Sequence, residues 1–143
     1  MADRYVGFES NPHDPDAECR RVAAWLERHG PVDTCVLGLG ANGHVGFNEP
    51  GATLNPHVHV AQLSEASRGH AMLLRTDRRP AYGLTLGMFD LMRSREVLLL
   101  VSGKAKRRPL RRLVNGPLDT GFPASLLGLH QNLTVVVDID AQG

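Results

Sequence analysis

An uninterrupted apolar run, Val97 to Val101, restricts the fold of this chain more than any other feature. A strand with one solvated face alternates apolar and polar side chains, so a run without alternation predicts a strand covered on both faces, as in a parallel sheet. Thr34 to Leu39 and Leu133 to Val137 are apolar in the same way. We therefore expect three strands of a largely parallel sheet with both faces buried.

Helical segments alternate with these strands. Asp14 and Pro15 offer an N-cap and a first-turn proline, and Gly30 followed by Pro31 ends the helix that they begin. Further helices are expected at residues 65–74, 87–92, 104–114 and 123–130, and further strands at residues 57–63 and 82–86. The alternation predicts an α/β fold with three layers, α/β/α and Rossmann-like, and a largely parallel sheet.

The length of 143 residues suits one globular domain. A complete doubly wound domain opens with a strand and its first βα turn, whereas the first convincing strand here begins at Thr34. We therefore expect residues 1–143 to be the C-terminal part of a single domain whose N-terminal strands are not included.

Charge, hydropathy and cysteine content argue against several classes of protein. The formal net charge is +1 and many basic residues gather in one run, residues 104–112, so nothing argues for nucleic acid. No stretch approaches the roughly 18 apolar residues that span a bilayer, and the N-terminus lacks the layout of a signal peptide. Cys19 and Cys35 fall in segments that we expect to be packed, as free thiols inside cells do. We expect a cytoplasmic protein without nucleic-acid or membrane partners.

A glycine-rich loop follows the first expected strand. Residues 38–43 read GLGANG and match the dinucleotide-binding pattern GxGxxG. That interpretation needs a helix opening at the loop and an acidic residue about 20 positions later. Residues 48–51, NEPG, would interrupt the helix, and residues 60–63 read VAQL, without an acid. The sequence therefore disfavours a nucleotide site.

The same loop carries a histidine and a carboxylate. His44 and Glu49 follow the end of the strand, and glycines between them and the strand allow tight turns and close backbone approach. A histidine can move a proton at neutral pH, and a carboxylate can fix its tautomer and stabilise its charged form. Taken alone, the two residues fit a catalytic pair or a surface histidine beside a surface glutamate.

Residues 42–51, NGHVGFNEPG, resemble the D-G-H-I-x-F-N-E-P signature of the glucosamine-6-phosphate deaminase family. The resemblance covers nearly the whole chain and continues through Leu54 and residues 83–87, 96–101, 103–106 and 123–130. Within the family, the galactosamine-6-phosphate isomerase branch is the most similar. Asn42 stands where the glucosamine enzymes carry aspartate, residues 123–125 read PAS, residues 4–8 are similar, and the chain stops soon after its last strand.

The resemblance implies an aldose–ketose isomerisation with deamination. Such enzymes turn galactosamine 6-phosphate or glucosamine 6-phosphate into a ketose 6-phosphate and ammonia, without a metal or organic cofactor. His44 is then the acid and base for the ring oxygen, and Glu49 orients it and stabilises its charge. Asn42 can hydrogen-bond but carries no charge, and we expect it to position the substrate or the His44 network.

The resemblance also implies a phosphate site. Lys106 matches the family lysine that contacts the sugar phosphate, and an ammonium after a strand suits that task. Gly40 and Gly43 are expected to bind the substrate through close backbone approach. A family arginine that also holds phosphate corresponds to Arg68 or Arg75, and the local similarity does not choose between them.

Two other functions stay open. A 6-phosphogluconolactonase shares the fold and a G-x-x-x-D-G-H loop, but its usual continuation, of the type T-A-S-L-F-P, differs from residues 45–50, VGFNEP. A non-catalytic sugar-phosphate-binding module would keep the loop and the lysine. Nothing in the sequence matches the family's serine/glycine-rich phosphate loop or its proton-abstracting aspartate, so we expect the chain alone to have little or no activity. The sequence does not decide whether the chain forms a homo-oligomer.

Overall fold

The computed structural model describes residues 5–69 and 80–143, and its first element is the helix α1, Pro15–His29. Asp14 caps the helix by accepting a hydrogen bond from the backbone N–H of Ala17 (2.9 Å), and Gly30, with φ of 86°, follows its last residue. The expected helix and both of its end signals are confirmed.

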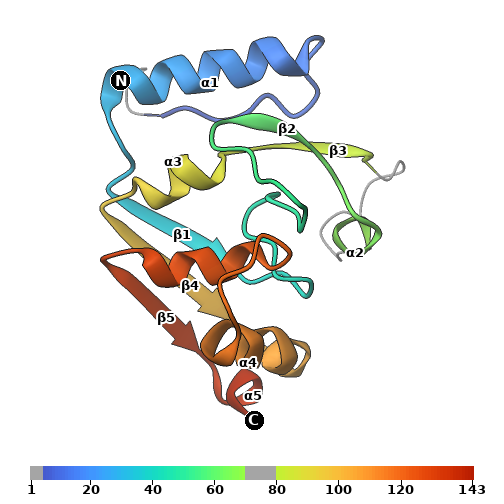
Figure 1. Cartoon of the computed structure of the whole chain (residues 1–143). Helices are drawn as coiled ribbons and strands as arrows, with labels where there is room; N and C mark the ends of the chain where they lie inside the picture. The colour runs from blue at the N-terminus through green and yellow to red at the C-terminus, as the bar shows by residue number, and fades with distance from the viewer. Residues whose placement is uncertain (1–4, 70–79) are drawn as a thin grey trace.

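The three strands expected from the apolar runs form one parallel sheet. They are β1 (Thr34–Gly38), β4 (Glu96–Val101) and β5 (Leu133–Val137), in the order β1-β4-β5. In register, Val36 pairs with Leu98 and Leu100 pairs with Val136. Figure 1 shows the three arrows side by side, pointing the same way. The α/β class with a parallel sheet is therefore confirmed.

The middle of the chain forms a separate two-stranded ribbon. Strand β2 (His59–Gln62) pairs antiparallel with β3 (Tyr82–Thr85), and α1 packs against this ribbon. The helix expected at residues 65–74 is much shorter in its described part: α2 spans Glu65–Arg68, and Gly69 caps it. The rest of that expected helix lies outside the described residues.

The remaining helices lie before and after the strands of the parallel sheet in the chain. They are α3 (Met88–Met92), the 3₁₀ turn η3 (Lys104–Lys106) that leads into α4 (Arg107–Asn115), the 3₁₀ helix η4 (Pro123–Leu129) and α5 (Ile139–Gln142). Pro109 lies in the first turn of α4, where its missing N–H costs no helical hydrogen bond. No helix within residues 5–69 and 80–143 is long and apolar enough to cross a bilayer.

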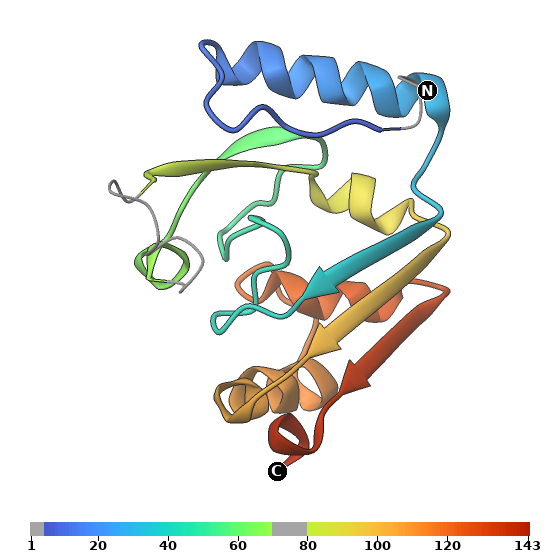
Figure 2. The same ribbon diagram turned by 180° about the vertical axis from the view of Figure 1, so that it is seen from behind.

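Only one face of the parallel sheet is covered by the described residues. Val97, Leu99 and Val101 are buried in the main core together with side chains from α3, η4 and α5. On the opposite face Val36, Leu100 and Val136 are 58%, 44% and 49% exposed. Figure 2 views the strands from this open side.

The expectation that both faces of these strands are buried is therefore wrong for the described structure. Successive side chains of a strand point to opposite faces, and the helices that follow these strands pack on one of the two. The last strand departs furthest from the expectation, since Thr134, Val135 and Val136 are all exposed at the edge of the sheet.

Candidate active site

A compact turn follows β1 at the carboxyl end of the sheet. The backbone N–H of Gly40 donates to the carbonyl of His44 (2.9 Å), and that of Gly43 donates to the carbonyl of Gly40 (3.0 Å). The buried Asn48 amide donates to the carbonyls of Val45 (3.0 Å) and Leu86 (2.9 Å), which holds the far end of the loop. No helix opens in this loop, so it lacks the helix N-terminus that a dinucleotide site requires.

The glycines of the loop make room for neighbouring rings. A Cβ atom on Gly40 would overlap the imidazole of His44. Gly43 has φ of 91°, and a Cβ atom there would overlap the ring of Phe122. Both positions therefore need glycine for packing, and their contact with substrate stays a prediction.

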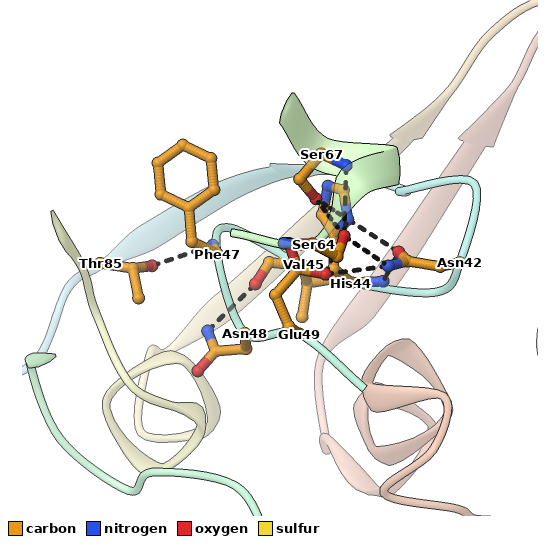
Figure 3. Close-up of polar contacts among 9 residues, drawn as sticks. All are labelled: Asn42, His44, Val45, Phe47, Asn48, Glu49, Ser64, Ser67 and Thr85. Carbon is orange, nitrogen blue, oxygen red and sulfur yellow. Dashed lines mark hydrogen bonds and ion pairs between the residues drawn. The ribbon is translucent and has the colours of Figure 1, made fainter. Parts of the chain in front are cut away.

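Asn42, His44 and Glu49 form one hydrogen-bonded network (Figure 3). The Oδ1 atom of Asn42 accepts from the backbone N–H of His44 (3.1 Å) and lies 2.8 Å from its Nδ1 atom. The Nδ2 atom of Asn42 donates to Oε2 of Glu49 (2.8 Å). The Glu49 carboxylate can only accept hydrogen bonds, so the NH2 group of Asn42 faces Glu49 and the amide oxygen faces the imidazole of His44. That oxygen also accepts, which selects the His44 tautomer with its proton on Nδ1.

Helix α2 supplies two serines that the sequence analysis missed. The backbone N–H of Ser64 donates to Oε1 of Glu49 (3.3 Å), and its hydroxyl caps α2 by accepting from the N–H of Ser67 (3.2 Å). Ser67 is only 2% exposed, and its Oγ atom lies 3.2 Å from Nδ1 of His44. Ser64 is the N-cap of α2 and Ser67 its third residue, a spacing that is typical of a helix start but carries no signal for these contacts.

The groups around Glu49 determine the direction in which its pKa is shifted. Burial is the largest influence and by itself raises the pKa of the carboxyl, but hydrogen bonds from Ser67, Asn42 and Ser64, with the charge of His44, outweigh it. The pKa of Glu49 is therefore lowered, and the residue is a carboxylate at neutral pH. Its Oε2 atom lies 3.8 Å from Nδ1 of His44, close enough to stabilise an imidazolium.

The cationic residues expected to hold phosphate lie in two different elements. Lys106 is half-buried in η3, directly after β4, which is the neighbour of β1. Arg68 ends α2, next to Ser67, and its Nε atom is buried without a hydrogen-bond partner among the described residues. Arg75, the other candidate for phosphate, lies outside the described residues.

A cavity of about 270 Å³ opens beside Glu49. It lies between the loop and the β2 strand, and its lining includes Phe47, Glu49, Leu54, His59 and Gln62. No group of three or more histidine, cysteine or acidic side chains suited to a metal occurs in the described part of the chain. The Nδ1 atom of His57 lies 3.2 Å from a carboxylate oxygen of Asp90.

Comparison with known proteins gives a consistent result. Residues 2–136 match the family model of glucosamine-6-phosphate isomerases/6-phosphogluconolactonase. The chain is 41% identical over 136 residues to the AgaI protein of Escherichia coli (strain K12), covering 95% of this chain and 54% of that protein. It is 41% identical over 133 residues to glucosamine-6-phosphate deaminase 1 of Bacillus subtilis (strain 168), covering 92% and 55%. The chain thus spans about half the length of the curated relatives it matches.

Solved structures agree with these matches. A monomeric glucosamine-6-phosphate deaminase superposes with a TM-score of 0.91 at 38% identity, over 99% of this chain and 60% of that chain. The 6-phosphogluconolactonase of Trypanosoma brucei superposes with a TM-score of 0.70 at 20% identity, over 93% and 54%. The second likeness carries information about the fold alone.

Proposed function

The chain belongs to the family of glucosamine-6-phosphate isomerases/6-phosphogluconolactonase, and we propose that it carries the ring-opening part of an amino-sugar-6-phosphate deaminase site. The observation that supports this most directly is the Asn42–His44–Glu49 network at the carboxyl end of β1. In open α/β sheets, ligands bind outside the carboxyl ends of the strands. The relatives that match at about 40% identity include glucosamine-6-phosphate deaminases.

His44 is the proton carrier in this proposal. With Nδ1–H held by Asn42, Nε2 is the ring nitrogen that takes the proton of the anomeric hydroxyl and gives it to the ring oxygen as the C1–O bond of the ring breaks. The product is the open-chain aldehyde. Glu49 stabilises the imidazolium that forms between the two transfers, since its pKa is lowered and its charge lies 3.8 Å away.

Arg68 and Lys106 hold the phosphate. The Nε atom of Arg68 has no hydrogen-bond partner among residues 5–69 and 80–143, which is costly for a buried guanidinium, and a phosphate ester supplies both a charge and an acceptor. Arg68 shares α2 with Ser67, so the same helix touches the phosphate and the His44 network. Between the two arginines named by the sequence, this placement favours Arg68.

The amino sugar is galactosamine 6-phosphate or glucosamine 6-phosphate, and Asn42 in place of an aspartate favours the galactosamine branch. The second chemical step, transfer of the C2 proton to C1, needs another base. Glu49 is the one carboxylate with hydrogen bonds to the Asn42–His44 network within the described residues, and it is occupied there. Residues 1–143 alone are therefore expected to have little or no isomerase activity. Cys19 and Cys35 are free and buried, which fits a reaction in the cytoplasm.

Two measurements test the proposal. In the first, sugar phosphates are titrated into the purified chain while the His44 and arginine side-chain signals are followed by NMR. Galactosamine 6-phosphate should shift the signals of His44 and Arg68, and inorganic phosphate should shift Arg68 alone. If galactosamine 6-phosphate shifts the His44 signals of the variant Arg68→Gln as much as those of the parent chain, the phosphate assignment is contradicted.

In the second, the chain is joined to the part of the solved monomeric deaminase that lies outside the superposed region, and this fusion enzyme is assayed. Ammonia and ketose 6-phosphate should form from one or both amino sugars, and none should form in His44→Ala. Hydrolysis of 6-phosphogluconolactone without deamination would favour the lactonase, and phosphate-ester binding with neither reaction would favour the non-catalytic module.

A further inference from the structure

A second segment of the chain holds the loop after β1 at both of its ends. The N–H of Ala124 donates to the carbonyl of Gly43 (2.9 Å), and the N–H of Gly51 donates to the carbonyl of Thr120 (3.3 Å). We call the segment that makes both contacts, residues 119–125, the anchoring turn. The imidazole and the carboxylate in Figure 3 belong to residues between these two attachments. The anchoring turn therefore limits how far the two groups can move apart.

An aromatic ring fills the space at the first attachment. Phe122 is 2% exposed, and its ring packs against Gly43, where a Cβ atom would overlap it. The guanidinium carbon of Arg112, on α4, lies 4.6 Å from the centre of that ring, within the range of a cation–π contact. The side chain of Arg112 thus contacts the ring that packs against the residue before His44.

Asp119 holds the anchoring turn in shape. Its Oδ1 atom accepts from the N–H of Gly121 (2.8 Å), and its carbonyl accepts from the N–H of Phe122 (2.9 Å). Its own N–H donates to the hydroxyl oxygen of the buried Ser125 (2.9 Å). Its Oδ2 atom accepts from Nη2 of Arg112 (2.8 Å), so one guanidinium contacts both the carboxylate and the ring. These bonds join α4 to the turn.

The ion pair of Arg112 and Asp119 is a weak source of stability. The two side chains are 49% and 40% exposed, and ion pairs at such positions contribute little to folding. Geometry is far more sensitive, since a misplacement of about 1 Å in a reacting group can cost about 10²-fold in rate. The ion pair is therefore better placed to control the geometry of the loop than the stability of the chain.

We propose that Asp119, together with Arg112, is a positioning residue that fixes the separation of His44 and Glu49 through the anchoring turn. The inference rests on the proposed function of this histidine and carboxylate. The hydrogen bond of Asp119 to a backbone N–H keeps the turn closed, and its ion pair keeps the guanidinium beside the aromatic ring. Loss of the Asp119 carboxylate should therefore loosen both attachments of the loop.

The test is NMR titration of the Glu49 carboxyl in the 143-residue chain. Burial raises the pKa of Glu49, and hydrogen bonds with the charge of His44 outweigh burial, so a loosened network should raise this pKa. The variant Asp119→Ala should therefore raise it. Asp119→Asn should raise it less, because it keeps an acceptor for the N–H of Gly121. In the fusion enzyme, Asp119→Ala should lower kcat by about tenfold and change KM by less than about twofold, as expected when groups that act in the transition state are misplaced.

Asp33→Ala is the matched control. Asp33 pairs with Arg95 (3.3 Å) where β1 and β4 begin, at the end of the sheet opposite to the loop, and both side chains are exposed. This variant should leave the pKa of Glu49 and kcat unchanged. If circular dichroism shows that Asp119→Ala does not fold, Arg112→Gln takes its place.

A pKa of Glu49 in Asp119→Ala equal to that of the parent chain would overturn the inference. So would an equal rise in Asp33→Ala, or an unchanged kcat in an active fusion enzyme. A pKa that rises only in Asp119→Ala, while the parent fusion enzyme releases no ammonia, would support the anchoring turn and count against the proposed catalysis.

Discussion

Two carboxylates with lowered pKa values, Glu18 in α1 and Glu49 in the loop after β1, are held in very different ways. Glu18 is 6% exposed and accepts hydrogen bonds from Nε and Nη2 of Arg21 (2.8 and 2.7 Å) and from the N–H of Glu9 (2.7 Å). Arg21 is the main cause that lowers the pKa of Glu18 to about 2. Glu49 is held by neutral amide and hydroxyl groups and by a histidine.

The difference separates a structural site from a site that can change its charge. The Arg21 guanidinium also donates to the carbonyl of Gly7 (2.6 Å), so the Glu18 pair fastens the segment before α1 onto the helix. Arginine stays charged at all ordinary pH values, and the Glu18 pair therefore has one state. His44 can gain and lose a proton beside Glu49, while the Nε atom of Arg68 is buried without a hydrogen-bond partner in the described part of the chain. The arrangement around Glu49 can therefore exchange a proton and accept an anionic group, as a substrate site requires.

The largest expected contrast is in turnover. In the fusion enzyme, Glu49→Gln should lower kcat by about 10² to 10⁴, because the imidazolium loses its charge partner. Glu18→Gln should change kcat by less than about threefold, since its contacts lie in α1 and the segment before it. Steady-state ammonia release measures both. Equal losses in the two variants would show that Glu49 acts only through stability.

A smaller effect is expected when Asn42 becomes charged. In Asn42→Asp the new carboxylate would stand about where the amide now donates to Glu49, so two like charges would share the His44 site. The acid limb of the pH–kcat profile should move and kcat should fall by about tenfold. The resemblance to the glucosamine enzymes implies an aspartate at this position in them, so we expect preference to shift toward glucosamine 6-phosphate as well. An unchanged profile and preference would exclude a positioning role for Asn42.

The Glu18 pair should dominate stability instead. Glu18→Gln should lower the free energy of unfolding of the chain at pH 7 by about 1 to 2 kcal/mol, a value reduced because the Arg21 side chain is half exposed. The folded pKa lies below the ordinary value of 4.5, so this contribution is present above pH 4.5 and disappears as the pH falls toward 2. Urea unfolding should show that the difference in the free energy of unfolding between variant and parent is smaller in acid than at pH 7. A gap that persists at pH 2 would contradict the assignment.

The smallest effect concerns the hydroxyl of Ser67. Ser67→Ala removes a hydrogen bond that helps to lower the pKa of Glu49, so that pKa should rise. The net loss is about 0.5 to 1.5 kcal/mol, or a few-fold in kcat of the fusion enzyme. Ser102→Ala serves as the control, since Ser102 contacts Asp138 rather than the loop. NMR titration of the Glu49 carboxyl measures this pKa directly. A pKa equal to that of the parent would show that the Ser67 hydroxyl does not interact with Glu49.

Much of the site was predictable because it is local. Asn42, His44 and Glu49 lie within one stretch of eight residues, and the glycines around them indicate a tight loop after a strand. The contacts of Ser64 and Ser67 were not predictable, because they depend on how α2 folds back over the loop. The choice of Arg68 rests on the same folding back.

The sequence by itself determined the strands, their parallel pairing and the loop that follows β1, since apolar periodicity and turn chemistry act over a few neighbouring residues. Only the tertiary structure decided which side of the sheet is covered and which distant donors reach Glu49. An apolar side chain such as Val36 or Leu100 signals that it should be buried but not by what, because that depends on segments packed from elsewhere.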